Sequence, residues 1–319
     1  MNLFKAESDS KSLEFVNAVE LSSHLEGDEE GKVVGVFSQA FYDTIYVPTA
    51  DGQCLKFNSE LEFTKRIKLG DVSSQIVSTA MSPNEEHVVF VCEDGTITLL
   101  DKHFEVEKKE QVHRVDASKG HFDCSITWRF DSEYFSVIHN QANGGQSMTY
   151  TRSLQKFHTN SLYHADYDLV RNVFEKPDST LLPINSWVPN GSLIYGIRRS
   201  LAKDKLTTTI LAWEKNCLHY KEFQLPDFVD DNFNVKKIQF SKDSIVMFVW
   251  IVSKDQEQNQ VLIYTRSNAE WHFKLNLPIQ GKVFEVLTGF NQIQLLQAKQ
   301  LLSIHYNITS RTFEYEKNE

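Results

Sequence analysis

A short phrase recurs along the chain at intervals of about fifty residues. Each copy contains a large or apolar residue, then a short polar turn with Pro, Asp, Asn or Ser, and then a β-rich run. Four copies begin at Met81, Trp128, Trp187 and Phe240 and read MSPNEEHVVFV, WRFDSEYFSVI, WVPNGSLIYGI and FSKDSIVMFVW. By subtraction, these starts lie 47, 59 and 53 residues apart. A period in this range indicates a supersecondary unit that is repeated along the chain and packs against its own copies.

Two Asp-Gly pairs mark a hairpin inside the unit. The segment TIYVPTADGQCLKF from Thr44 aligns with HVVFVCEDGTITLL from His87, so that Asp51-Gly52 and Asp94-Gly95 coincide at a spacing of 43 residues. Asp-Gly between two β-rich runs favours a tight hairpin, because the primed turns need positive φ at their central residues. Asn143-Gly144 is expected to play the same part within a longer and more polar connection.

A third extended run follows each hairpin. Such runs cover 96–100, 148–152, 208–213 and 261–266. Three such β-rich runs and the strand that opens the phrase make four strands per unit. Val, Ile, Thr and aromatic residues dominate these strands. Four-stranded units around a common axis are the plan of a β-propeller. We therefore expect an all-β, WD-repeat-like β-propeller of about 6–7 four-stranded blades, and the sequence leaves open whether the ring is complete.

The repeat predicts a single propeller domain over 1–319, with recognisable blades over 31–319 and a poorly defined amino-terminal segment over 1–30. The run NQIQLLQAKQLLSIHYN from Asn291 is compatible with a helix, but we interpret it as a final hairpin around Ala298-Lys299. Polar insertions are expected to form loops at 26–31, 114–120, 163–182 and 254–260. The longest, 163–182, is the candidate for a partner-facing loop, and a disordered insertion is the alternative.

The charge balance argues against broad binding of nucleic acid. The chain has 33 Lys and Arg against 43 Asp and Glu, a net charge of −10, whereas phosphate backbones favour clustered cations. Three tight basic clusters are present, and Tyr195 is the aromatic residue nearest to one of them. They comprise Lys65, Arg66 and Lys68; Arg198, Arg199, Lys203 and Lys205; and Lys236 and Lys237. We interpret them as solvated strand ends, with phosphate contacts as the alternative.

Metal and disulfide chemistry find little support in the sequence. The cysteines Cys54, Cys92, Cys124 and Cys217 are widely spaced and form no CxxC pair, which argues against a zinc site or a disulfide framework. One loose group has metal-capable atoms and is interpreted as an ordinary loop that enters a strand; its members are His113, His121, Asp123 and Cys124. No signal segment and no apolar window of about 18 residues stand in the chain, so we expect a reduced, soluble, intracellular protein.

Enzyme motifs are equally scarce. GxGxxG, GxxxxGK[ST], HExxH and GxSxG are all missing, and Gly144-Gly145 lacks the strand-to-helix context of a phosphate site. Acidic groups such as Asp227, Asp230 and Asp231, or Asp28 and Glu29, are interpreted as solvated surface. The sequence therefore predicts no catalytic residue, no cofactor and no bound metal. The five tryptophans are expected to pack in the core; they are Trp128, Trp187, Trp213, Trp250 and Trp271.

Several phrases, taken in order, resemble the amino-terminal propeller of the Elongator complex protein 1 (IKAP) family. They are SITWRFDSEYFSV from Ser125, NSWVPNGSLIYGI from Asn185, ILAWEKNCLHYKEFQLP from Ile210, IQFSKDSIVMFVWI from Ile238 and VLIYTRSNAEWHFKLNL from Val261. An acidic break followed by GKVVGV from Gly31 resembles the same family, so the likeness covers most of the chain from about residue 31 onward.

The chain also departs from that family's pattern, so it resembles a divergent member. The pattern would place Gly where Phe130 and Cys217 stand and Trp where Tyr264 stands. The WD dipeptide of ordinary WD repeats is missing, and Gly120-His121 is its only partial echo.

The resemblance implies a non-catalytic scaffold in a complex that modifies the wobble uridine of tRNA in the cytoplasm, with the nucleus as a further location. It implies other Elongator subunits as protein partners, indirect contact with tRNA at most, and neither membrane nor DNA. In that family the radical chemistry, acetyl-CoA and iron-sulfur cluster belong to a different subunit. Family members are several times longer, so the chain is expected to be a fragment or a shortened form, and their dimerisation is not carried over.

Three alternatives remain open from the sequence. One is a propeller that binds RNA directly through the basic clusters, and another is a WD-repeat-like adaptor of a different complex. The third is an enzyme or ligand-binding propeller with a polar funnel at its axis, for which no motif speaks.

Overall fold

The computed structural model describes most of the chain, with gaps. The described residues are 2–6, 13–18, 32–39, 42–111, 122–140, 146–151, 153, 156–161, 167–168, 173–174, 179–202, 205–216, 218–230, 232–255, 258–279, 283–288, 292–297, 301–307 and 312–318.

These residues form six four-stranded sheets in which consecutive strands pair antiparallel. The first two sheets are β3 (Phe37–Gln39), β4 (Thr44–Pro48), β5 (Gln53–Asn58) and β6 (Phe63–Lys68), and β7 (Ile76–Met81), β8 (His87–Cys92), β9 (Thr96–Asp101) and β10 (Val106–Gln111). The next two are β11 (Asp123–Trp128), β12 (Tyr134–Asn140), β13 (Gln146–Thr151) and β14 (Lys156–Ser161), and β17 (Ser179–Trp187), β18 (Leu193–Ala202), β19 (Lys205–Glu214) and β20 (His219–Gln224). The last two are β21 (Phe233–Phe240), β22 (Val246–Ser253), β23 (Asn259–Ser267) and β24 (Glu270–Ile279), and β25 (Val283–Thr288), β26 (Gln292–Gln297), β27 (Leu301–Asn307) and β28 (Thr312–Asn318).

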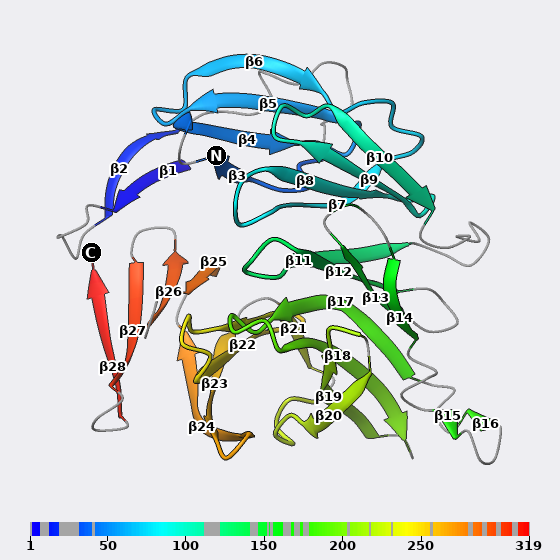
Figure 1. The fold of residues 1–319 in the computed structure, drawn as a ribbon. Coiled ribbons are helices and arrows are strands. Elements are labelled where there is room, and N and C mark those ends of the chain that lie inside the picture. Colours follow the sequence, from blue (N-terminus) through cyan, green and yellow to red (C-terminus); the bar gives the residue numbers. More distant parts are fainter. Residues whose placement is uncertain are drawn as a thin grey trace.

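The sheets follow one another around a ring (Figure 1). Contacts between β7 and β11, between β11 and β17, and between β17 and β21 join the first strands of neighbouring sheets, so these strands are the inner ones. The arrangement confirms the predicted all-β propeller of four-stranded blades. Six such sheets in the described part of the chain agree with the expected number of blades.

Two short strand pairs lie outside the six sheets. β1 (Asn2–Ala6) pairs with β2 (Leu13–Ala18), and β15 (Tyr167–Asp168) pairs with β16 (Val173–Phe174). Figure 1 shows the β1–β2 pair between the sheet β3–β6 and the sheet β25–β28. The segment 1–30, predicted to be poorly defined, thus contains an antiparallel strand pair, and the predicted partner-facing loop 163–182 contains β15, β16 and the start of β17.

The recurring phrase folds into the same turn in four sheets. In each copy, the backbone amide of the first turn residue donates to the carbonyl of the residue that begins the second strand. The carbonyl of the same turn residue accepts from the amide of a residue with left-handed φ. The left-handed residues are Glu85 (61°), Ser132 (63°), Gly191 (73°) and Ser244 (63°). Ser82, for example, donates its amide to the His87 carbonyl at 2.8 Å and accepts from the Glu85 amide at 2.9 Å. The sequence alignment of the phrases is therefore also an alignment of backbone conformations.

The two Asp-Gly hairpins form where the sequence predicted them, but with another turn type. Left-handed φ falls on Gly52 (84°) and Gly95 (81°) and on neither Asp51 nor Asp94. The Gly52 amide donates to the Thr49 carbonyl at 3.1 Å, which makes a turn closed by a left-handed glycine instead of a primed turn. The Asp94 carboxylate accepts from the Thr96 amide at 2.9 Å, and this bond holds Asp94 in its ordinary conformation. Asn143-Gly144 lies outside the described residues.

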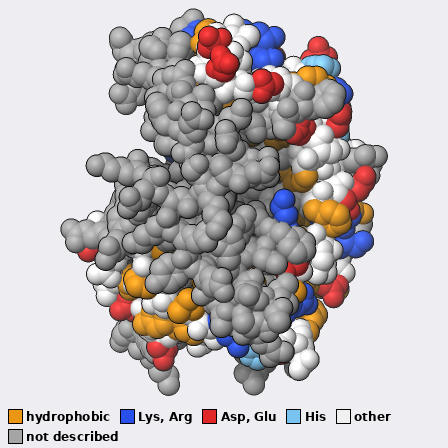
Figure 2. Space-filling model, turned by 90° about the vertical axis from the view of Figure 1, so that its left-hand side faces the viewer, with side chains coloured by type: hydrophobic (Ala, Val, Ile, Leu, Met, Phe, Trp, Pro, Cys, Tyr) orange, Lys and Arg blue, Asp and Glu red, His pale blue; other side chains and the backbone are white. Residues whose placement is uncertain are grey.

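The second and third strands supply most of the core and are covered on both faces. In β22, whose sequence is VMFVWIVS, seven of the eight side chains are buried and only Trp250 is half-buried. By contrast, the outer strands β6 (FTKRIK) and β10 (VEKKEQ) are polar and mostly exposed. Charged outer strands discourage pairing with another chain at the sheet edge. Figure 2 shows cations and carboxylates interspersed along the described rim of one face.

The predicted role of the tryptophans is confirmed for three of the five. Trp128, Trp187 and Trp213 are buried, whereas Trp250 and Trp271 are half-buried and pack against buried clusters. The indole of Trp271 donates to the hydroxyl of Tyr195 at 2.9 Å.

The carboxy-terminal hairpin is also confirmed, because β26 and β27 pair antiparallel on either side of 298–300. Within the described ranges, no helix has the length and apolar character that crossing a bilayer requires.

Candidate functional site

One face of the ring carries the turns that join first to second and third to fourth strands, because alternate turns of an antiparallel meander open at the same end of a sheet. We call it the turn face. Hydrogen bonds link its turns from sheet to sheet. The Asn84 amide donates to the Ser132 hydroxyl at 3.0 Å, and the Asn190 amide donates to the Ser244 hydroxyl at 3.1 Å. The left-handed residue of one turn thereby holds the preceding turn in place.

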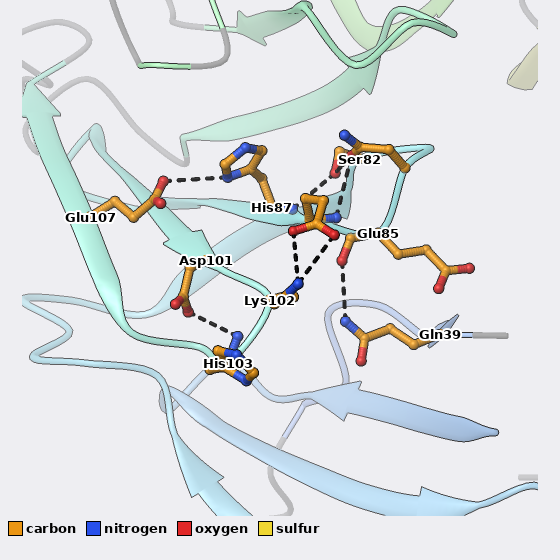
Figure 3. A network of polar contacts seen from close by, with 10 residues as sticks. Gln39, Ser82, Glu85, His87, Asp101, Lys102, His103 and Glu107 are labelled. Carbon is orange, nitrogen blue, oxygen red and sulfur yellow. Dashed lines mark hydrogen bonds and ion pairs between the residues drawn. The ribbon is translucent and has the colours of Figure 1, made fainter. Parts of the chain in front are cut away.

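The same linkage continues toward β3. The side-chain amide of Gln39 donates to the Glu85 carbonyl at 3.2 Å, which joins the sheet β3–β6 to the β7–β8 turn (Figure 3). Within the sheet β7–β10, Lys102 pairs with Glu86 at 3.1 Å. These contacts fix the turns of two neighbouring sheets against each other, so groups on the turn face are presented by a rigid frame.

A pocket of about 420 Å³ opens on this face among three sheets. Its walls come from four turns or strand ends: Arg129 from the β11–β12 turn, Leu193 and its preceding residues from the β17–β18 turn, Lys215 and Tyr220 from the β19–β20 region, and Arg266 from the end of β23. The sheet β17–β20 contributes two of these walls, and the sheets on either side close the pocket with Arg129 and Arg266.

Three cations converge on the pocket, and aromatic rings orient them. The Arg129 guanidinium lies 4.3 Å from the centre of the Tyr134 ring, and the Lys215 ammonium lies 5.6 Å from that same ring. The Arg266 guanidinium lies 6.0 Å from the centre of the Trp271 ring. A ring face attracts the cation that lies over it, and the N–H groups that point away from the ring remain able to bind an anion. The pocket is therefore electropositive.

Of the three cations, Arg129 has a carboxylate partner. Two of its nitrogens donate to Asp131 at 2.9 and 2.5 Å. Partial burial disfavours the charged carboxylate, but hydrogen bonds from Arg129 outweigh it and hold the pKa of Asp131 below its ordinary value. Among the described residues that line the pocket, Glu214 is the acidic one, and it is exposed.

Exposed apolar side chains border the pocket. Phe130 is 58% exposed, Leu218 is 61% exposed and Tyr220 is 46% exposed. Phe130 reaches across to the β17–β18 turn, where a Cβ on Gly191 would lie 3.0 Å from its ring. The combination of a cationic pocket and an apolar border suits an amphipathic ligand.

The basic cluster that the sequence nominated for phosphate contacts is built differently from either expectation. Arg198 is only 2% exposed and its guanidinium pairs with Glu222 at 3.1 Å. Arg199 is half-buried and donates to the side-chain oxygen of Asn234 at 3.1 Å and to the Phe233 carbonyl. The interpretation as solvated strand ends is wrong for Arg198, and so is its use as a phosphate site, because this side chain is buried and already paired with a carboxylate.

The other two basic clusters keep their solvated character in part. Lys65, Lys68 and Lys236 are exposed, whereas Arg66 and Lys237 are half-buried. Lys203 lies outside the described residues, and nothing is described of the Lys205 side chain.

The remaining candidate groups do not gather in the described chain. Asp123 is exposed and Cys124 is buried, whereas His113 and His121 lie outside the described residues. Asp227 and Asp230 are exposed, and Asp231, Asp28, Glu29, Gly144 and Gly145 are not described. Across the described ranges no group of three or more His, Cys, Asp and Glu side chains is placed to hold a metal ion.

Three cysteines are free thiols in the core. Burial raises the pKa of Cys54 to about 12 and that of Cys92 to about 11, and it raises the pKa of Cys124 well above the ordinary value. Cys217 is not described.

Sequence reasoning missed the pocket because its cations are isolated in the chain. Arg129, Lys215 and Arg266 each stand next to a turn of a different sheet, and none belongs to a basic cluster. One available signal was the Arg129-Phe130 pair inside a repeated phrase.

Solved structures with the same fold share little sequence with this chain. A β-propeller domain of Cps50 (Swd1) from Myceliophteria thermophila superposes with a TM-score of 0.58 at 8% identity, covering 91% of this chain and 88% of that one. A chain of the mitotic checkpoint complex superposes with a TM-score of 0.59 at 12% identity, covering 100% of this chain and 85% of that one. These likenesses show the fold alone.

Sequence relatives are more specific. Elongator complex protein 1 of Mus musculus is 25% identical over 310 residues, covering 83% of this chain and 21% of that protein. The Drosophila melanogaster protein of the same name is 24% identical over 281 residues, covering 76% of this chain and 21% of its own length. The chain thus spans about a fifth of the length of these relatives.

A family model describes the ELP1 first N-terminal β-propeller, and it matches residues 108–291, which is more than half of the chain. The match includes the sheets that carry the pocket. This chain therefore belongs to the family of the first N-terminal β-propeller of ELP1, as its repeated phrases predicted.

Proposed function

We propose that this chain is a non-catalytic scaffold of an Elongator-type complex and supports modification of the tRNA wobble uridine through contacts with other subunits. The observation that carries the proposal is the family match together with the cross-linked turn face. Hydrogen bonds such as those from Asn84 to Ser132 and from Asn190 to Ser244 join successive turns. A scaffold needs this rigidity, since loops and edges that are held in advance lose little entropy on binding.

The proposed chemistry of the chain is presentation, with no bond made or broken. Its relatives are subunits of a multi-subunit complex by name, and the match covers a propeller domain. Propellers commonly bind partners through the loops and turns at their faces. We accordingly propose a cytoplasmic location and other Elongator subunits as partners.

Affinity purification from native lysate tests the proposal. The endogenous protein is tagged and co-purifying proteins are quantified by mass spectrometry, and we expect other Elongator subunits in fixed ratio. Recovery of unrelated partners alone would contradict the scaffold role in this complex. Nucleoside analysis of tRNA from cells depleted of the protein provides the second readout, with an expected loss of the modified wobble uridine.

A further inference from the structure

We propose that the turn-face pocket docks a carboxylate-rich peptide segment of a partner protein, anchored by at least one large apolar side chain. This inference rests on the proposed scaffold function and names the chemistry of one of its contacts. The pocket is lined by Arg129, Lys215 and Arg266 and bordered by Phe130, Leu218 and Tyr220.

Charge complementarity identifies the anionic part of the ligand. The chain carries a net charge of −10, yet among the described residues three cations and one carboxylate, that of Glu214, line this pocket. Arg129 already has Asp131 as its partner. Lys215 and Arg266 make ring contacts and, within the described part of the chain, pair with no carboxylate. Two cationic groups are thus held in place for anions that another molecule would bring.

Cavity size and border residues identify the apolar part. A volume of about 420 Å³ lies within the range of about 300–1,000 Å³ that ligand-binding pockets occupy. Leu218 and Phe130 are more than half exposed. Phe130 lies against Gly191 in the pocket wall, and the Leu218 carbonyl accepts from the amide of Glu214, which lines the pocket. Large apolar groups that remain exposed on a rigid face, next to oriented cations, have the composition of an interface core with a polar rim.

A peptide fits these observations better than RNA does. An RNA strand requires cations along a track and open aromatic faces on which bases stack. Phe130 and Tyr220 offer exposed rings, but the three cations converge on one pocket and do not follow a track. The negative net charge of the chain also repels a long polyanion more than a short segment with a few carboxylates.

Site-specific photo-crosslinking in the native complex tests the inference. Tyr220 is replaced by p-benzoylphenylalanine in the full protein, and the crosslinked product is mapped by mass spectrometry. Phe63 on β6, another exposed aromatic residue, receives the same replacement as the matched control. We expect position 220, and not position 63, to crosslink to a protein segment rich in Asp and Glu that contains a large apolar residue.

Charge reversal provides the second arm. Lys215→Glu with Arg266→Glu should lower the crosslinking yield about tenfold, because each reversal replaces attraction by repulsion. Lys215→Glu alone should give part of this loss, and its exposed side chain makes a folding defect unexpected. Lys65→Glu with Lys68→Glu is the control of equal charge on an exposed strand away from the pocket, and it should leave the yield unchanged.

The outcomes separate this inference from the scaffold function. A crosslink to RNA, to a phosphorylated or basic segment, or to nothing while the complex still co-purifies would overturn the docking site alone. An unchanged yield in the double reversal would do the same. If instead the purified protein lacks Elongator subunits but position 220 crosslinks to an acidic, apolar segment, the docking site stands and the proposed complex is wrong.

Discussion

The backbone amide of Asn190 donates a 3.1 Å hydrogen bond to the hydroxyl of Ser244, a residue 54 positions later in the next sheet. Asn84 and Ser132 repeat the relationship at a separation of 48 positions. In both cases the serine is the left-handed residue of its own turn, so a residue that shapes one turn also holds the turn before it.

Removal of that hydroxyl should loosen the ring. We expect Ser244→Ala to lower the free energy of unfolding by about 1 kcal/mol, because the amide of Asn190 loses its acceptor. Chemical denaturation measures the change. Ser59→Ala is the control, since this serine bonds Asp43 at the exposed surface, and it should have a smaller effect. Equal losses in the two variants would show that the hydrogen bond between sheets stabilises the protein no more than an exposed hydrogen bond does.

Gly191 tests the close approach of two turns. Its φ is +73°, and an added Cβ would lie 3.0 Å from the Phe130 ring and 3.2 Å from the Arg129 side chain. Gly191→Ala should destabilise the fold by about 1–2 kcal/mol through backbone strain and this contact. In the Phe130→Ala background the loss should be smaller, because part of the contact disappears. A double-mutant cycle by denaturation measures the coupling, and strict additivity would contradict it.

Arg198 and Glu222 form an ion pair, and neutralising one partner should change the stability of the protein by a different amount from neutralising the other. Arg198 is 2% exposed, whereas the Glu222 side chain is 40% exposed. Glu222→Gln takes a carboxylate from a buried cation and should cost about 3 kcal/mol, whereas Arg198→Met should cost less because the remaining carboxylate reaches water. Urea denaturation of both variants checks the order, and the reverse order would contradict the prediction. Arg198→Glu should destabilise the protein strongly, so it is unsuitable for testing RNA binding.

The buried thiol of Cys54 predicts a loss of stability at alkaline pH. Burial raises its pKa in the folded protein from 9.0 to about 12. A raised pKa means that the folded state keeps a proton that the unfolded state loses, so this contribution is complete below pH 9 and is lost as the pH rises toward 12. The free energy of unfolding should therefore fall more steeply above pH 9 in the wild type than in Cys54→Ala. Parallel pH profiles for the two proteins would contradict this assignment.

Local patterns predicted most of the fold correctly. The phrase that begins at Phe240 and the one that begins at Trp187 predicted turns that the structure shows with the same hydrogen bonds. The prediction of a primed turn at Asp51-Gly52 was wrong. The Gly52 amide donates to the Thr49 carbonyl, and the Asp51 carboxylate accepts from the Gln53 amide. Both bonds favour a turn that ends on a left-handed glycine. Turn type depends on such local details, while the existence of the hairpin depends only on the flanking β-rich runs.

The candidate site could not be predicted in the same way. Arg198 and Arg199 are adjacent in sequence, and nothing in their neighbours shows which one enters the core. Alternate residues of a strand face opposite sides, so the answer depends on which sheet packs on which side. Arg129, Lys215 and Arg266 lie far apart in sequence and meet only because three sheets stand next to one another.

By itself, the sequence determined the repeat, the four-stranded unit, the turn positions and the family, since each of these depends on short-range chemistry that is written several times in the chain. Only the tertiary structure decided that Arg198 is buried and that three isolated cations share one pocket. The physical reason is that packing between sheets brings together residues that no local pattern connects, and burial and local electric field depend on that packing.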